Sequence, residues 1–112
     1  PYQNLDVGVT GVVVKSSMGQ LYGVLAFNLA GFTASGAFIR YLKIYDKATA
    51  PTASDTPKLT LVLDPAVEPT FPFPTCGVAF ASGIGIRATT GLAVADTGAP
   101  GTNEVVVNLL YR

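Results

Sequence analysis

The chain has 112 residues, enough for one domain with a single hydrophobic core. Hydrophobic residues make up 49% of it, a usual share, whereas charged residues make up only 12%, well below what is typical. Seven Lys and Arg balance seven Asp and Glu, so no net charge attracts nucleic acid, an anionic membrane or an acidic substrate. A surface so poor in charge is weakly protected against association, and we expect part of it to contact protein.

Cys76 is the only cysteine, so no intramolecular disulfide can form, and we expect it to pack as an inert, small hydrophobic residue. The opening residues 1–4 lack the regions of a signal peptide, and no apolar run has the length of a membrane span. These features predict a soluble product made in a cytoplasm, with no membrane partner.

Strand-like runs begin at residue 10. The run 10–17 contains three consecutive valines and ends in a Ser-Met-Gly turn, and the run 20–28 is its expected partner. Strict alternation along the second run predicts two faces. One face carries Leu21, Gly23, Leu25 and Phe27, and the other carries Gln20, Tyr22, Val24 and Ala26.

Residues 30–36 are small and are expected to form a loop. The run 37–45 is compatible with a strand and with a helix, because Phe38, Tyr41 and Leu42 also have the spacing of one helical face. We predict a strand there, since β-favouring residues dominate the run and no strong helix cap precedes it.

The segment 46–57 is rich in Pro, Thr and Asp and is expected to be a long exposed connection. A half-buried strand follows at 58–63, where leucines alternate with polar residues. Four prolines make 64–75 an extended stretch that can pair only at a sheet edge. The remaining expected strands are 77–81, 83–90, 91–96 and 103–111, with a Gly-Ala-Pro-Gly loop before the last.

About eight short strands without an internal repeat predict an all-β fold, a single antiparallel β-sandwich of jelly-roll type over residues 1–112. For residues 1–11 we consider two possibilities, an extended N-terminal arm that orders on a neighbour, and an ordinary edge strand or frayed terminus. In the strands 20–28 and 103–111, apolar residues occupy both faces. That pattern predicts that these strands pack on protein twice, once inside the domain and once outside it.

No histidine is present, which removes the commonest general base and the usual metal ligand. No familiar zinc ligand set can be drawn, and Gly83 to Arg87 lacks the register of a phosphate-binding loop. We expect no enzyme, cofactor, metal or small-molecule substrate. The acidic residues are expected to cap or turn the backbone, and the less favoured alternatives are a glycosidase pair or a calcium site in 46–55. They are Asp46, Asp55, Asp64, Glu68, Asp96 and Glu104.

Two long segments resemble small virion structural proteins of tailed phages, in particular the capsid decoration, or cement, proteins. The first is Arg40-Tyr-Leu-Lys-Ile-Tyr-Asp-Lys-Ala-Thr-Ala-Pro51 followed by Asp55-Thr-Pro-Lys-Leu-Thr60. The second comprises Gly85-Ile-Arg-Ala-Thr-Thr-Gly-Leu-Ala93 and the closing Val105-Val-Val-Asn-Leu-Leu-Tyr111. The resemblance covers about residues 36–112 and involves strand and loop patterns without a catalytic signature.

The resemblance implies a protein on the capsid surface of the virion that binds the major capsid protein and stabilises the assembled head. It also implies a homo-oligomer, with a trimer favoured. The alternative is a carbohydrate-binding or adhesin sandwich of a phage tail or cell surface, in which Tyr22, Tyr41, Tyr45 and Tyr111 stack on sugars. The residues that we expect at an interface are Tyr2, Leu5, Val7, Tyr22, Tyr41 and Tyr45.

Overall fold

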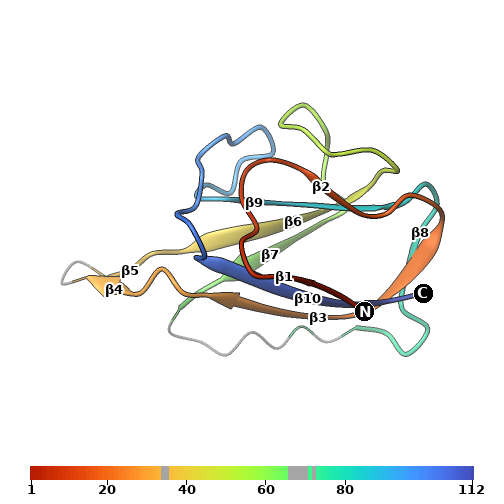
Figure 1. Cartoon of the computed structure of the whole chain (residues 1–112), viewed down its shortest axis with the longest axis horizontal. Coiled ribbons are helices and arrows are strands. Elements are labelled where there is room, and N and C mark those ends of the chain that lie inside the picture. The colour runs from red at the N-terminus through yellow and green to blue at the C-terminus, as the bar shows by residue number, and fades with distance from the viewer. Residues whose placement is uncertain (34–35, 66–70, 72) are drawn as a thin grey trace.

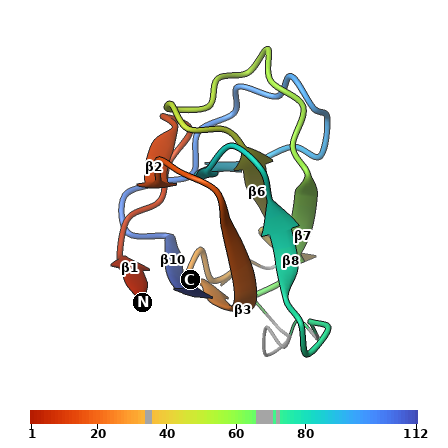
Figure 2. The ribbon, with the colours of Figure 1, turned by 90° about the vertical axis from the view of Figure 1, so that its right-hand side faces the viewer.

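The computed structural model describes residues 1–33, 36–65, 71 and 73–112. Within them, two four-stranded antiparallel sheets pack face to face as a β-sandwich, with a small hairpin at one end (Figure 1). Seen end-on, the sheets form two layers (Figure 2). The strands are Tyr2–Asn4 (β1), Val12–Lys15 (β2), Gly19–Asn28 (β3), Phe32–Thr33 (β4), Gly36–Ala37 (β5), Arg40–Asp46 (β6), Leu59–Leu63 (β7), Val78–Phe80 (β8), Ile84–Thr89 (β9) and Val105–Tyr111 (β10).

The strand order is that of a jelly roll. Sheet A has the order β1-β10-β3-β8 and sheet B the order β2-β9-β6-β7. With the β4–β5 hairpin set aside, the first strand pairs with the last, β2 with β9, β3 with β8, and β6 with β7. A long antiparallel hairpin that wraps over itself produces this nested pairing. The predicted jelly-roll sandwich is therefore confirmed.

Buried aliphatic side chains from both sheets fill the space between the layers. The strand β10 contributes alternate residues to this core, as its apolar period predicts, and the other face of β10 points outward. The largest contributions from the remaining strands are Leu21, Leu42, Ile44, Leu63, Phe80, Ile84 and Ile86.

A β-bulge changes the predicted faces of β3. Leu110 pairs with Gly23, whereas Tyr111 pairs with Leu21, so Tyr22 is an extra residue on β3. An extra residue reverses the alternation beyond it. Leu21 points into the core, but Leu25 and Phe27 point outward, so the prediction that all three share a face is wrong.

The other differences concern short segments. Tyr2–Asn4 is an edge strand on β10, and so the second possibility considered for the N-terminal segment is the one found. The predicted loop at 30–36 contains β4 and the start of β5, while the ambiguous run at 37–45 is largely strand β6. The predicted strand at 91–96 is a loop, because the Asp96 carboxylate accepts backbone hydrogen bonds from Gly91 and Gly98 and folds the segment back on itself. Part of the predicted extended stretch at 64–75 lies outside the described residues.

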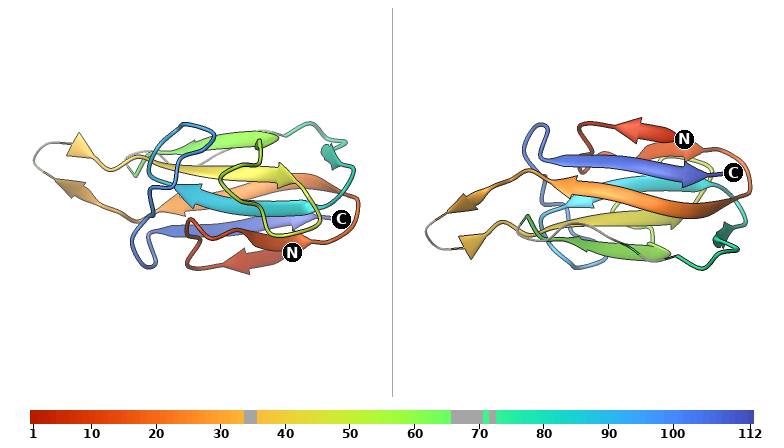
Figure 3. Two further views of the ribbon diagram at one scale, coloured as in Figure 1. Left: turned by 90° about the horizontal axis from the view of Figure 1, so that it is seen from above. Right: turned by 90° about the horizontal axis from the view of Figure 1, so that it is seen from below.

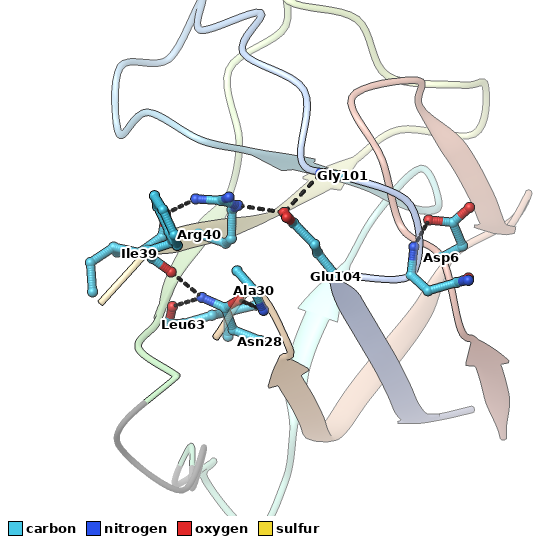
Figure 4. A network of polar contacts seen from close by, with 10 residues as sticks. Asp6, Asn28, Ala30, Ile39, Arg40, Leu63, Gly101 and Glu104 are labelled. Atoms are coloured by element: carbon cyan, nitrogen blue, oxygen red, sulfur yellow. Dashed lines mark hydrogen bonds and ion pairs between the residues drawn. The ribbon is translucent and has the colours of Figure 1, made fainter. Parts of the chain in front are cut away.

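A group of polar contacts joins the two sheets where the β4–β5 hairpin leaves the sandwich (Figure 4). Asn28 at the end of β3 donates to the carbonyl oxygens of Phe38 and Leu63. Close by, Arg40 of β6 forms an ion pair with Glu104, which precedes β10, at 2.8 Å from Nε to Oε2. The hydrogen bond from the guanidinium holds the pKa of Glu104 below its usual range. These contacts therefore join strands of both sheets at this end of the sandwich.

Candidate functional site

The outward side of sheet A is apolar and open. Leu25 and Phe27 on β3 and Leu110 on β10 are exposed, with Leu25 at 50% and Leu110 at 58%. An antiparallel sheet with one side in water normally carries polar residues there. Viewed from below, no loop of the described residues crosses β3 and β10 (Figure 3, right). We call this surface the sheet A face, and it consists of Gln3, Tyr22, Leu25, Phe27, Val106, Asn108 and Leu110.

The strand register arranges these side chains in rows. One row pairs Phe27 with Val106, and the next contains Leu25, Asn108 and Gln3. In the third row Leu110 lies over Gly23, where an added Cβ would be 3.4 Å from its Cδ1. Each member of the sheet A face is an uncharged residue, and its polar members are two amides and a phenol. The chemistry of the face is therefore that of an interface core with a few hydrogen-bonding groups.

The outward side of sheet B is covered by the chain itself. Loops of residues 47–58 and 90–104 cross β6 and β9 (Figure 3, left). Lys43 and Arg87 face each other across these strands, and both are buried. The Lys43 ammonium donates to the carbonyl oxygen of Ala93, 2.5 Å away in the covering loop. The two sheets thus differ, because the central strands of sheet B are covered while those of sheet A are not, although Val62 on the edge strand β7 is also exposed.

Arg87 binds two segments that cover sheet B and one side chain of the sheet itself. Its guanidinium donates to the carbonyl oxygens of Val9 and Asp96 and to the hydroxyl of Tyr45, at 2.8, 3.2 and 3.1 Å. Burial lowers the pKa of Lys43, and the charge of Arg87 acts in the same direction, while Asp96 opposes both. Both cations serve to hold the covering loops in place.

Two open pockets lie at the end of the molecule opposite the β4–β5 hairpin. One adjoins the sheet A face, has a volume of about 410 Å³ and is lined by Pro1, Tyr22, Leu110, Tyr111 and Arg112. The second, of about 630 Å³, includes Met18, Lys58 and Phe80. The first pocket extends the apolar surface of sheet A to the end of the sandwich.

The residues expected at an interface are divided between surface and interior. Leu5 and Tyr22 are exposed, while Tyr2 and Tyr41 are half-buried. Val7 is 0% exposed and Tyr45 1%, so both belong to the interior and neither is available to a partner. Val7 is held in the interior by a hydrogen bond from its N–H to the carbonyl oxygen of Val105. Tyr45 is covered together with its partner Arg87.

The four tyrosines of the sugar-binding alternative do not form one platform. Tyr22 and Tyr111 line the same pocket at the end of sheet A. Tyr41 and Tyr45 belong to β6 of sheet B, where Tyr45 is buried. The alternative therefore has two tyrosines in one place and two in another layer of the fold.

The acidic residues mostly organise the backbone, as expected. The Asp46 carboxylate accepts hydrogen bonds from the backbone N–H groups of Ala81, Ser82 and Gly83, which lower its pKa to about 2. Asp55 binds Lys47 at 2.6 Å, and this hydrogen bond lowers its pKa. Hydrogen-bond donors of the protein therefore contact both carboxylates of the 46–55 loop, the alternative calcium site. Glu68 lies outside the described residues.

Among the described residues, no three His, Cys, Asp or Glu side chains come together as ligands for a metal ion. Cys76 is exposed, so the expectation that it packs as a buried hydrophobic residue is wrong. The described part of the chain also contains no helix long and apolar enough to cross a membrane.

Of the sheet A face, the sequence predicted only Tyr22 as an interface residue and missed Gln3, Leu25, Phe27, Val106, Asn108 and Leu110. Apolar residues on both faces of the strands 20–28 and 103–111 did indicate that these two strands contact protein outside the domain. They did not indicate which residues of β3 point outward. Comparison with protein-family models, curated proteins and solved structures found no match.

Proposed function

We propose that the protein is a structural subunit of a phage virion, a decoration protein that binds the major capsid protein and stabilises the assembled head. The observation that supports an assembly role is the difference between the two outer surfaces of the sandwich. The loops of the chain cover β6 and β9 of sheet B, whereas the central strands of sheet A leave Leu25, Phe27 and Leu110 in solvent. A contiguous apolar surface is characteristic of a protein contact.

The placement on a phage head rests on the resemblance of residues 36–112 to decoration proteins. The jelly roll is compatible with this placement, because it recurs in viral capsid domains, but it also recurs in lectins. A decoration protein works mechanically. Binding only to the assembled lattice stabilises that lattice by mass action, and no chemical step is required.

The direct test adds the purified protein to heads that lack it. We expect it to sediment with the heads up to a saturating number of copies set by the lattice, and to delay the release of DNA on heating. Image reconstruction of the saturated particles should show density on the capsid surface. Heads that bind no protein, or bind only the few copies that a tail tip holds, would refute the proposal.

The carbohydrate-binding alternative has one feature in its favour, the pocket that Tyr22 and Tyr111 line beside Arg112. A glycan array measured with the wild type and with Tyr22→Ala separates the two functions. Glycan binding that is lost in Tyr22→Ala, without any binding to heads, would favour the alternative.

A further inference from the structure

We propose that Lys58 and Asp46 keep the strands of other chains from adding to the open edge of sheet A at β8. We call these two residues the edge pair. Among the described strands, β8 is the last on its side of sheet A, and such an edge offers its backbone groups to other chains. The inference does not depend on the proposed function, because it concerns how the chain avoids associating with itself.

The backbone groups of Ala79 on β8 point away from β3. Gln20 of β3 exchanges two hydrogen bonds with Arg112, on the side of β10, at 3.0 and 2.9 Å. In an antiparallel ladder a residue that bonds to one neighbouring strand does not bond to the other, so Gln20 and its partner Ala79 are a non-hydrogen-bonded pair. The N–H and the carbonyl oxygen of Ala79 therefore face the open side of the strand.

The edge pair contacts this open side. Lys58 donates from Nζ to the carbonyl oxygen of Ala79 at 2.6 Å, and Oδ2 of Asp46 accepts from the N–H of Ala81 at 2.9 Å. The same carboxylate oxygen lies 3.4 Å from the Lys58 ammonium. One residue of a neighbouring parallel strand would supply both groups, its N–H to Ala79 and its carbonyl oxygen to Ala81. The edge pair thus takes the place of one residue of an added strand.

Both side chains reach this edge from sheet B. Asp46 ends β6, and Lys58 immediately precedes β7. The Lys58 ammonium also lies 5.1 Å from the centre of the Phe80 ring, and Asp46 also accepts from the N–H of Ser82 at 2.7 Å. An exposed ion pair alone is weakly held in one geometry. These further contacts therefore hold both side chains against β8.

The edge is otherwise accessible to another chain. Ala79 and Ala81 are exposed, and together with Lys58 they line the open pocket of about 630 Å³. The strand β8 has only three residues, so few of its backbone groups face outward, and the edge pair engages that of Ala79 and the next one along. Charged side chains, lysine above all, commonly block such edges. A surface poor in charge needs this local protection, because general repulsion between copies is weak.

Lys58→Met tests the proposal, because it removes the ammonium and keeps the aliphatic stem beside Phe80. At about 100 μM, where unpaired strand edges lead to association, sedimentation velocity should show about tenfold more associated protein than for the wild type. Lys47→Met is the matched control. Lys47 also pairs with an aspartate, Asp55, and its side chain is 33% exposed against 38% for Lys58. Lys47→Met and the charge-preserving Lys58→Arg should both associate no more than the wild type.

A second substitution shows whether the association occurs at β8. Proline is tolerated in an edge strand where its missing N–H would face solvent, so Ala79→Pro should preserve the pairing of β8 with β3. The double variant Lys58→Met/Ala79→Pro should return to the association state of the wild type, and circular dichroism checks that it is folded. A folded double variant that still associates would overturn the proposal, as would equal association of Lys58→Met and Lys47→Met.

Amide hydrogen exchange of Lys58→Met gives a measurement that does not rely on the proline variant. The N–H of Ala79 should exchange more slowly in concentrated than in dilute solution, because an added strand accepts its hydrogen bond. Exchange at Ala79 that is independent of concentration, in a sample that associates, would place the contact elsewhere and would also overturn the proposal.

Discussion

The side-chain amide of Asn28 donates to the carbonyl oxygen of Leu63 over 2.7 Å, and so joins an inner strand of sheet A to the edge strand of sheet B. The same amide donates to the carbonyl oxygen of Phe38 at 2.6 Å, and its oxygen accepts from the N–H of Ala30 at 3.0 Å. Asn28 is buried, so water is poorly placed to substitute for these contacts. One side chain thus serves three backbone groups at the base of the β4–β5 hairpin.

Asn28→Ala should destabilise the domain by about 2–3 kcal/mol, because it leaves buried carbonyl oxygens without a donor. Urea denaturation followed by circular dichroism measures the change. Asn103→Gly provides a control, since Asn103 is exposed and has a φ of 58° that glycine adopts freely. This control should shift the free energy of unfolding by less than about 0.5 kcal/mol. Equal effects of the two substitutions would show that the amide does not join the sheets.

Gly11→Ala should displace the loop that covers sheet B. A Cβ at Gly11 would lie 1.9 Å from the carbonyl oxygen of Pro51, and a contact with backbone cannot be relieved by a rotamer change. We expect a loss of stability of about 2–3 kcal/mol, measured by thermal and urea unfolding. Gly8→Ala is the matched control, because nothing lies within 4 Å of the added Cβ. A Gly11→Ala protein as stable as Gly8→Ala would contradict the close approach of Pro51.

Alternation of apolar residues was sufficient to predict β10 and its two faces, because an uninterrupted strand obeys a period of two. It failed on β3 beyond Tyr22, since a bulge depends on how a strand fits its partner and leaves no mark in a single sequence. For the same reason the sequence identified the doubly apolar strands but grouped Leu25 and Phe27 with Leu21, which points inward. The jelly-roll class survived this error, because it depends on the number and spacing of the strands.

The covered side of sheet B was also beyond sequence reasoning. Lys43 and Arg87 are charged, and charged residues on a strand usually face solvent. Only the fold brings the loop carbonyl oxygens of Ala93 and Asp96 over them. Tyr45 was expected at an interface because tyrosines often lie there, and Val7 because it belongs to the possible N-terminal arm. Both are instead buried by segments distant in the sequence, a tertiary effect that no local pattern encodes.

Lys43→Met should leave stability at pH 7 within about 1 kcal/mol of the wild type or raise it, because a buried cation costs desolvation. The folded pKa of Lys43 lies below its ordinary value of 10.5, so the unfolded chain binds this proton more tightly. The wild type should therefore gain stability as the pH rises from the folded pKa toward 10.5, and Lys43→Met should lack this gain.

Guanidinium chloride unfolding at pH 7, 9 and 10 tests this difference between the two proteins. Lys43→Arg serves as the control, because arginine stays charged over this range and should likewise show no alkaline gain from position 43. Parallel pH profiles for the wild type and Lys43→Met would contradict the expectation.

Asp46 links β6 to the turn between β8 and β9, and its removal should change the acid stability of the domain. The folded pKa is about 2, below the ordinary value of 3.8, so the ionised carboxylate is favoured in the folded state. Its contribution is fully present above about pH 4 and is lost as the pH falls through the folded pKa. One pKa unit is worth about 1.4 kcal/mol, so Asp46→Asn should cost about 2 kcal/mol at pH 7.

Urea midpoints measured from pH 2 to pH 7 should show a smaller acid slope for Asp46→Asn than for the wild type. Lys58→Met separates the two kinds of partner, because Lys58 also approaches the carboxylate, at 3.4 Å. The backbone N–H groups of Ala81 and Ser82 contribute most to the lowered pKa, so Lys58→Met should keep most of the acid slope. If Lys58→Met removes the slope as fully as Asp46→Asn does, the ion pair and not the backbone donors holds the carboxylate in its charged form.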